Sequence, residues 1–323
     1  MDNNVSKKTF LHKFFKLAFN NEKTSLSLKE LLQQMLLSTL DLSQQSWNFT
    51  FDPRFAARTI GSKIVLLHSS IESISFDRQI QQVLSTPQSA PIVYRSSIAL
   101  LLASYTQKTP QIVAEELIDY LVSTIDNSDS QLNLNLCVEI GKSGLIDFYF
   151  DHESMAIWLE KSLVLLDIKT NVDLTKSFLG ESLKSTPSNL NLFPAQYIHA
   201  RCCTLLRLGI REKLLFFADE AQAISWLDHQ NNLWLREEAE LILLRQLCLI
   251  TDSFRAESSN WQKLALNFSA IIAIFLAECR VIGDTQQRNP QKAIARLRLI
   301  ALSQYWLQRI LVEKLKVVAP TSL

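Results

Sequence analysis

Glycine is scarce in this chain, with only 6 residues among 323. Doubly wound nucleotide-binding cores place glycines in their phosphate loops and in tight turns, so this composition argues against such a core. Hydrophobic residues make up 47% and charged residues 20%, which is usual for a globular protein. The length allows two domains, and the scarcity of glycine beside abundant leucine predicts a mostly helical protein.

The chain also has almost no net charge, formally +1, so no global field draws it to nucleic acid and any polyanion site must be a local patch. Its 5 cysteines form no Cys-x-x-Cys pair, which favours free buried thiols over metal binding or disulfides. We expect no signal peptide and no transmembrane segment, because no apolar run reaches the roughly 18 residues that a bilayer requires. The longest run, residues 264–279, predicts a buried helix in a cytoplasmic protein.

Side-chain patterns typical of catalysis are missing as well. The adjacent carboxylates Glu237 and Glu238 would point about 100° apart on a helix, so they predict no catalytic dyad. Residues 141–143, Gly-Lys-Ser, lack the earlier glycine of a phosphate loop and indicate a hairpin turn. Residues 151–153, Asp-His-Glu, could bind a metal, but a helix N-terminus is the favoured interpretation. The sequence therefore predicts no catalytic residue, no metal and no cofactor.

Residues 1–88 are expected to form a helical N-terminal extension. Residues 9–19 combine lysines with apolar residues at helical spacing, which predicts a basic amphipathic helix. This helix would pack on the protein body; an arm that contacts a membrane surface or RNA is the alternative. Residues 27–40 predict a second helix, with Ser27 as N-cap and Glu30 at capping-box spacing. Residues 64–74 fit either a helix or a strand.

Residues 89–166 predict a small domain of mixed α and β structure. A helical stripe of apolar residues runs over 94–105, and a second helix begins with Thr109 as N-cap and Pro110 in its first turn. Leucines alternate with asparagines over 132–136, which predicts a strand, and residues 145–150 predict its return strand. A helix over 153–166 closes the domain.

Residues 192–323 predict a helical bundle, with helices over 193–207, 233–248, 261–282 and 290–318. Residues 167–191 lie between this bundle and the preceding domain. They are rich in serine, threonine and asparagine, so we expect a linker.

Residues 193–207, FPAQYIHARCCTLLR, resemble the first helix of the anticodon-binding (DALR) domain of arginyl-tRNA synthetases. EAELILLRQL at 238–247 and ARLRL at 295–299 are similar to its later helices. SIALLLA at 97–103, TPQIVAEELI at 109–118 and GLIDF at 144–148 resemble, in order and spacing, the family's N-terminal additional domain. The resemblance implies a mainly α protein: a small α+β domain of that type, followed by a DALR-type bundle.

The class I catalytic domain that the family places between these two domains is missing from this sequence. Residues 167–191 are too few for even one βαβ unit of about 30 residues. The sequence contains neither a His-x-Gly-His nor a Lys-Met-Ser-Lys-Ser motif, which in the family stabilise charge on the ATP phosphates. The family activity is ATP-dependent arginine–tRNA ligation, and we expect this chain not to catalyse it.

Lysine and arginine outnumber the acidic residues in 280–316. Anticodon-binding bundles contact splayed bases by stacking and phosphates through cations, so we predict tRNA or a tRNA-like RNA as the partner. A solubilising face with scattered ion pairs is the alternative. The candidate RNA contacts are Arg280, Arg288, Lys292, Arg296, Arg298 and Phe275.

The family-like motif itself contains Tyr197, His199, Arg201 and Arg207. Tyr197 and Arg201 share a helix face, whereas His199 points elsewhere. The resemblance implies that this helix is largely architectural, so core packing and helix bracing are favoured for these residues.

Two departures from the family concern the anticodon. Leu276 stands where the family has an aromatic residue after the position of Phe275, and Leu323 stands where it has a C-terminal methionine. Both changes remove groups suited to contact with a base, so the resemblance does not imply arginine-anticodon specificity. Two alternatives follow: a protein-interaction scaffold that has lost RNA binding, or a non-catalytic subunit of a split arginine–tRNA ligase.

Overall fold

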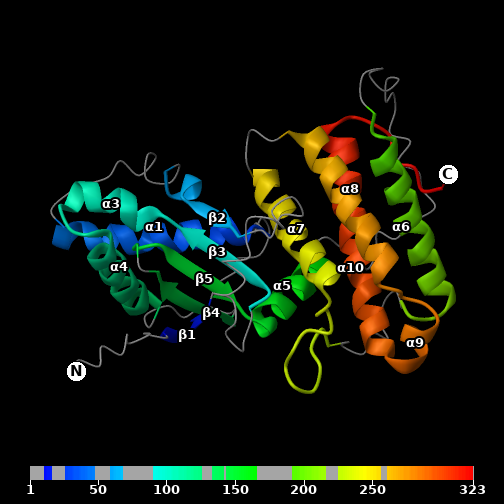
Figure 1. Cartoon of the computed structure of the whole chain (residues 1–323), viewed down its shortest axis with the longest axis horizontal. Coiled ribbons are helices and arrows are strands. Elements are labelled where there is room, and N and C mark those ends of the chain that lie inside the picture. Colours follow the sequence, from blue (N-terminus) through cyan, green and yellow to red (C-terminus); the bar gives the residue numbers. More distant parts are fainter. Residues whose placement is uncertain are drawn as a thin grey trace, which may run out of the picture. The chain divides into compact units, whose positions relative to one another are not determined.

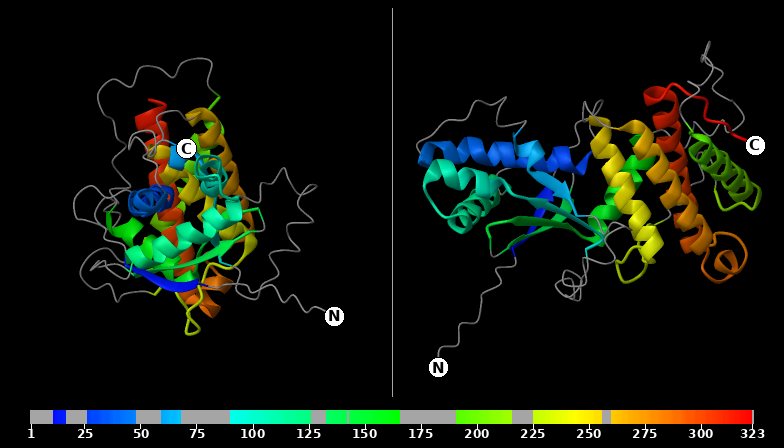
Figure 2. Two further views of the ribbon diagram at one scale, coloured as in Figure 1. Left: turned by 90° about the vertical axis from the view of Figure 1, so that its left-hand side faces the viewer. Right: turned by 45° about the horizontal axis from the view of Figure 1, so that its top comes forward.

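The computed structural model describes residues 11–16, 26–47, 59–67, 90–125, 133–141, 143–165, 191–215, 225–255 and 260–322. The chain divides into two compact units, Met1–Met155 and Ala156–Leu323. Helix α5 (His152–Leu165) begins in the first unit and continues into the second. Figures 1 and 2 show the helices and strands of both units.

The first unit is built on an antiparallel sheet whose five described strands follow the order β1-β4-β5-β3-β2. They are β1 (Leu11–Lys16), β2 (Ile64–Leu66), β3 (Ile92–Ser96), β4 (Asn133–Ile140) and β5 (Ile146–Phe150). A tight hairpin joins β4 to β5, where the Gly141 N–H donates to the Leu145 carbonyl at 2.8 Å. The hairpin predicted for residues 141–143 and its two flanking strands are thereby confirmed.

Helices α1 (Leu28–Trp47), α3 (Ile98–Thr106) and α4 (Pro110–Ile125) pack together, and α4 also contacts β4 and β1. The Ser27 hydroxyl accepts a hydrogen bond from the Glu30 N–H at 3.0 Å, which confirms the predicted N-cap of α1. At the start of α4, the Thr109 hydroxyl accepts one from the Ile112 N–H at 3.4 Å. These caps supply acceptors for N–H groups that a helix leaves unpaired at its beginning.

Two predictions for the first unit are wrong in secondary structure. Residues 11–16 form strand β1, paired with β4, and not the basic amphipathic helix predicted over 9–19. Pairing with a neighbouring strand is a tertiary effect that helical periodicity cannot report. The stripe predicted as a helix from residue 94 begins instead at Ile98, because Ile92–Ser96 forms β3. The ambiguous segment 64–74 contributes strand β2.

The second unit contains a bundle of helices. Its members are α6 (Phe193–Arg211), α7 (Glu238–Arg255), α8 (Trp261–Glu278), α9 (Asp284–Arg288) and α10 (Pro290–Arg309), which continues into the π-helical turn η2 (Ile310–Lys314). Helix α6 packs on α8 and α10, and α7 packs on the same two helices. The four predicted helices are present, but α7 begins five residues later and α10 ends before 318, where an extended tail follows.

Helix α8 is the one described helix that is long and apolar enough to cross a membrane, with a mean hydropathy of 1.2 over 18 residues. The core helix of a globular protein meets the same criteria, so the absence of a transmembrane segment stays a prediction. Phe268, Ile272 and Phe275 of α8 are buried in the second unit, where the helix contacts α6 and α7.

Candidate functional site

Arg296, a predicted RNA contact, lies inside the second unit, with 4% of its side chain exposed. Its Nε donates to Glu240 Oε1 at 2.6 Å, and a terminal nitrogen lies 2.8 Å from Glu237 Oε1. Its other terminal nitrogen donates to the backbone carbonyl of Arg280. Arg296 therefore ties α10 to α7 and to the end of α8. Because its donors face inward, the prediction that it contacts RNA is wrong.

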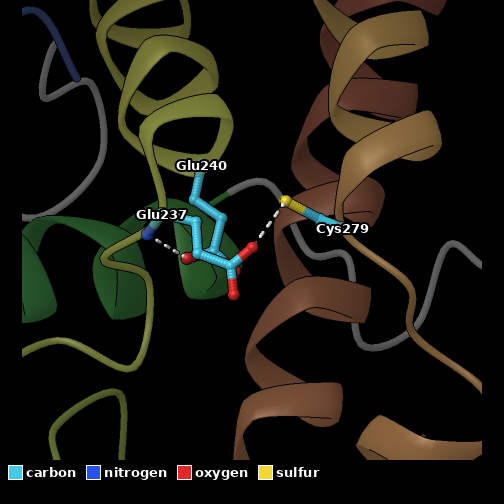
Figure 3. A group of neighbouring side chains, drawn as sticks. All are labelled: Glu237, Glu240 and Cys279. Carbon is cyan, nitrogen blue, oxygen red and sulfur yellow. Dashed lines mark hydrogen bonds between the residues drawn. The ribbon is translucent and has the colours of Figure 1, made fainter.

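Glu237, Glu240 and Cys279 lie close together (Figure 3), and Arg296 pairs with both of these carboxylates. Their potential ligand atoms all lie within 4.8 Å of one another, a spacing that could suit a metal ion. Burial alone would raise the pKa of Glu237, but the hydrogen bond from Lys292 at 2.6 Å and the charge of Arg296 lower it on balance. Burial raises the pKa of Cys279 to about 12, so its thiol is protonated at neutral pH. The carboxylates of Glu237 and Glu240 thus pair with the cations of Lys292 and Arg296, and these four side chains form an ion-pair cluster.

Two more of the predicted RNA contacts, Phe275 and Arg298, pack against other residues of the second unit. Phe275 is fully buried, so it cannot stack on a base, and that prediction is wrong. The Arg298 guanidinium lies 5.6 Å from the Trp226 ring and 3.5 Å from a Glu160 oxygen. The Trp226 indole N–H donates to the same Glu160 oxygen at 3.0 Å.

Arg280 and Arg288 are exposed, while Lys292 is partly exposed and holds Glu237. The six predicted contacts therefore do not converge on one surface. The excess of lysine and arginine in residues 280–316 overstates the positive charge that is free to bind RNA. The carboxylates that pair with Lys292, Arg296 and Arg298 lie outside this segment.

The outer face of α6 has a different arrangement. Phe193, Tyr197 and Arg201 are four residues apart, so they lie in a row along one face of the helix. Phe193 is 61% and Tyr197 43% exposed, and their ring centroids are 6.3 Å apart. Arg201 is exposed, and no described carboxylate lies within ion-pair distance of it. The favoured prediction of core packing for Tyr197 and Arg201 is therefore wrong.

We call Phe193, Tyr197, Arg201 and Arg211 the α6 stripe. Arg211 stands on the same face, because 18 residues make five full turns of an α-helix. It lies 3.7 Å from the Glu212 carboxylate, and both side chains are exposed, so this pair neutralises little charge. Two exposed aromatic rings followed by two arginines can stack on flat π-systems and bind anions along one line.

The C-terminal tail, residues 315–322, lies along α6 next to this stripe. The Gln196 amide donates to the Val318 carbonyl at 2.8 Å, and Arg207 donates to the Thr321 carbonyl at 2.9 Å. Val318 itself is exposed. The tail therefore forms a second edge beside Phe193 and Tyr197.

His199 fixes the tail between α6 and α10. Its Nδ1 lies 2.8 Å from the Pro320 carbonyl, and its Nε2 lies 2.8 Å from the Gln304 amide nitrogen. Because a carbonyl only accepts, Nδ1 carries the proton and Nε2 accepts from Gln304. Burial lowers the pKa of His199, so the imidazole is neutral. This neutral tautomer satisfies both contacts and holds the tail in place.

The chain is similar to the arginine–tRNA ligase of Synechococcus sp. (strain JA-3-3Ab), with 26% identity over 173 residues. This match covers 49% of the chain and 28% of the ligase, so the chain spans well under half of that relative's length. No family profile and no solved structure match the chain. The similarity indicates a distant relation to arginine–tRNA ligases, in agreement with the motifs along the sequence.

Proposed function

We propose that this protein is a non-catalytic relative of arginine–tRNA ligases that binds tRNA or a tRNA-like RNA in the cytoplasm. One observation carries the proposal: the α6 stripe exposes two aromatic rings and an arginine without an ion pair among the described residues. The stripe lies on the helix that resembles the start of an anticodon-binding bundle. Single-stranded RNA binds such surfaces by stacking its bases and placing its phosphates near cations.

Loss of catalysis is the second part of the proposal. The sequence has no His-x-Gly-His or Lys-Met-Ser-Lys-Ser motif, and residues 167–191 are too few for a nucleotide-binding domain. The distant ligase similarity supports a tRNA-related role, and the missing motifs support binding without ligation. No cofactor is needed for this role.

Filter-binding titrations against total tRNA and transcribed arginine tRNA, each at two salt concentrations, test the proposal. We expect salt-sensitive binding at or below micromolar levels. Tyr197→Ala should weaken it by about 1–3 kcal/mol, the usual cost of losing one base–aromatic stack. Arg201→Gln should reduce the slope of log K against log salt by about 0.7 through loss of one phosphate contact.

Tyr105→Ala is the matched control, because Tyr105 is also an exposed tyrosine, at 51%, but lies on α3 in the first unit. It should leave RNA affinity unchanged. Absence of binding by the unmodified protein at low salt would refute the RNA-binding proposal. Equal binding of both RNA samples would show that arginine specificity is not kept.

Exposed apolar side chains in the first unit favour a second candidate, a protein-interaction scaffold. Leu100 and Tyr105 on α3 and Ile112 on α4 are all exposed, and exposed apolar side chains of this kind can mark protein contacts. A scaffold should capture a protein partner without RNA, and Leu100→Glu should abolish that capture. Aminoacylation only after addition of a separate catalytic subunit would instead indicate a split ligase.

A further inference from the structure

A second group of aromatic and basic side chains lies where α7 ends, α8 begins and α10 ends. Phe254 lies 5.0 Å from Trp261 and 4.8 Å from Trp306 between ring centroids, and Tyr305 lies 5.6 Å from Trp306. Trp306 is buried, whereas the other three rings are partly exposed. Together with Arg309 and Lys314, these rings form what we call the aromatic end cluster.

The two cations of this cluster differ in what surrounds them. Arg309 lies 4.8 Å from the Phe254 ring and 5.2 Å from the Trp306 ring, and Glu313 accepts two hydrogen bonds from it at 2.7 and 2.8 Å. Its charge is therefore matched inside the cluster. Lys314 Nζ lies 4.9 Å from the Trp261 ring and 5.1 Å from the Phe254 ring.

Lys314 is exposed, and no described carboxylate lies within ion-pair distance of its ammonium group. The cluster consequently presents one unmatched positive charge at a defined place above two aromatic rings. This combination suits an anionic group attached to a flat, stackable one, which is the chemistry of a nucleotide.

The backbone at this point departs from the α-helix. Helix α10 gives way to the π turn η2, in which the Leu315 N–H donates to the Ile310 carbonyl at 3.0 Å. One extra residue in the turn rotates the side chains beyond it by roughly 100°. Such single π turns recur at functional sites. Here the turn carries Lys314, the unmatched cation.

The aromatic end cluster is continuous with the α6 stripe through the tail. Val318 lies four positions after Lys314, so their Cα atoms are at most about 14 Å apart. The Val318 carbonyl is bonded to Gln196, which lies between Phe193 and Tyr197 in the sequence. Lys316 and Val318 are exposed along this path. The cluster and the aromatic part of the stripe therefore belong to one end of the bundle.

We propose that the aromatic end cluster is a second contact for single-stranded RNA. Lys314 binds a phosphate, Trp261 stacks on a base, and the strand follows the tail from this cluster to the α6 stripe. The inference rests on the proposed RNA-binding function and extends its footprint beyond α6. An acidic peptide could also meet Lys314, but it would not use the partly exposed ring of Trp261 or the aromatic pair on α6.

The test compares Lys314→Gln and Trp261→Leu in the full chain, with total tRNA and a single-stranded oligouridylate as probes. Lys314→Gln should reduce the salt slope by about 0.7, the value for one single-strand phosphate contact. Trp261→Leu keeps an apolar side chain but removes stacking, and should weaken binding by about 5- to 150-fold. Lys213→Gln is the matched control: it removes a lysine that is also exposed but lies beyond the far end of α6, and it should change neither quantity.

The outcomes separate this inference from the proposed function. If the unmodified protein binds neither probe, the proposed function fails and the inference fails with it. If Tyr197→Ala weakens binding while Lys314→Gln matches Lys213→Gln, the function stands and the second contact is refuted. Should Trp261→Leu unfold on purification, the salt slope of Lys314→Gln decides alone, since Lys314 is exposed.

Discussion

Arg296 shows how a charge that is conspicuous in the sequence can belong to the interior of the fold. It lies in a basic part of the chain, yet its guanidinium is bonded to Glu240 on α7 and to Glu237, which directly precedes that helix. Lys292 also pairs with Glu237, and Arg309 pairs with Glu313. Glu237 and Glu240 are more than fifty residues away from the cations with which they pair, so a count of charges in a short window does not include them.

The buried pair of Arg296 and Glu240 leads to a stability prediction. Arg296→Leu leaves the Glu240 carboxylate buried without its main partner, and we expect a loss of about 3–5 kcal/mol in the free energy of unfolding. Urea titration followed by circular dichroism measures this loss. The double variant Arg296→Leu with Glu240→Leu should recover much of it, because no uncompensated charge remains. A single variant as stable as the parent would contradict the arrangement.

His199 gives a prediction about pH. Because burial lowers its folded-state pKa below the usual value of about 6.5, the unfolded chain binds this proton more readily. Stability from the neutral imidazole is therefore present above pH of about 6.5 and is lost as the pH falls below it. Urea titrations at several pH values should give a shallower dependence for His199→Gln than for the parent. Identical slopes would show that His199 does not contribute.

At the scale of elements, alanine substitutions at two glycines of the β4–β5 hairpin should differ sharply in their cost to stability. Gly144 has a φ of +76°, and a Cβ there would lie 2.6 Å from the Pro110 carbonyl carbon. We expect Gly144→Ala to cost about 2 kcal/mol or more, from strain together with a clash against rigid backbone. Gly141→Ala is the control in the same turn, because its Cβ would meet nothing closer than 3.6 Å. Thermal unfolding of both variants measures the difference, and equal midpoints would contradict it.

Local signals account for most of the elements. The caps at Ser27 and Thr109 and the alternation before Gly141 depend on neighbours within a few residues, so the sequence alone predicted them. Strand β1 was missed because its pairing with β4 joins residues more than a hundred positions apart. The α6 stripe has a local signal, a four-residue repeat opposite buried Ala195, Ile198 and Cys202. The family resemblance implied core packing for this helix instead. Which face of α6 is covered by α8 and α10 follows only from the fold.

The aromatic end cluster had no comparable signal in the sequence. Phe254, Trp261 and Lys314 come from three different elements, and their approach depends on how α7, α8 and η2 pack. The π turn that carries Lys314 has no recognisable residue pattern. Sites assembled from several helices in this way can be found only once the helices have been placed.

At the scale of the whole molecule, the chain combines a sheet-based unit and a helical unit, both with motifs that resemble arginine–tRNA ligases. The match to the Synechococcus ligase covers 28% of that protein, so most of the ligase has no counterpart in the alignment. Amino-acid activation requires groups that stabilise charge on ATP as pyrophosphate leaves. Binding of tRNA requires only surface stacking and phosphate contacts, so the two activities can be separated by experiment.

We expect the purified chain to bind tRNA but to catalyse neither arginine-dependent ATP–pyrophosphate exchange nor arginylation of tRNA. The reason is the absence from the sequence of both ATP-binding motifs of the class. An active arginine–tRNA ligase assayed in parallel shows that the reagents work, and the Tyr197→Ala variant provides a binding-deficient comparison. Exchange activity that the chain itself supports would contradict the proposed loss of catalysis. Inhibition of the active ligase by excess chain, relieved in Tyr197→Ala, would show that both proteins compete for the same tRNA through the α6 stripe.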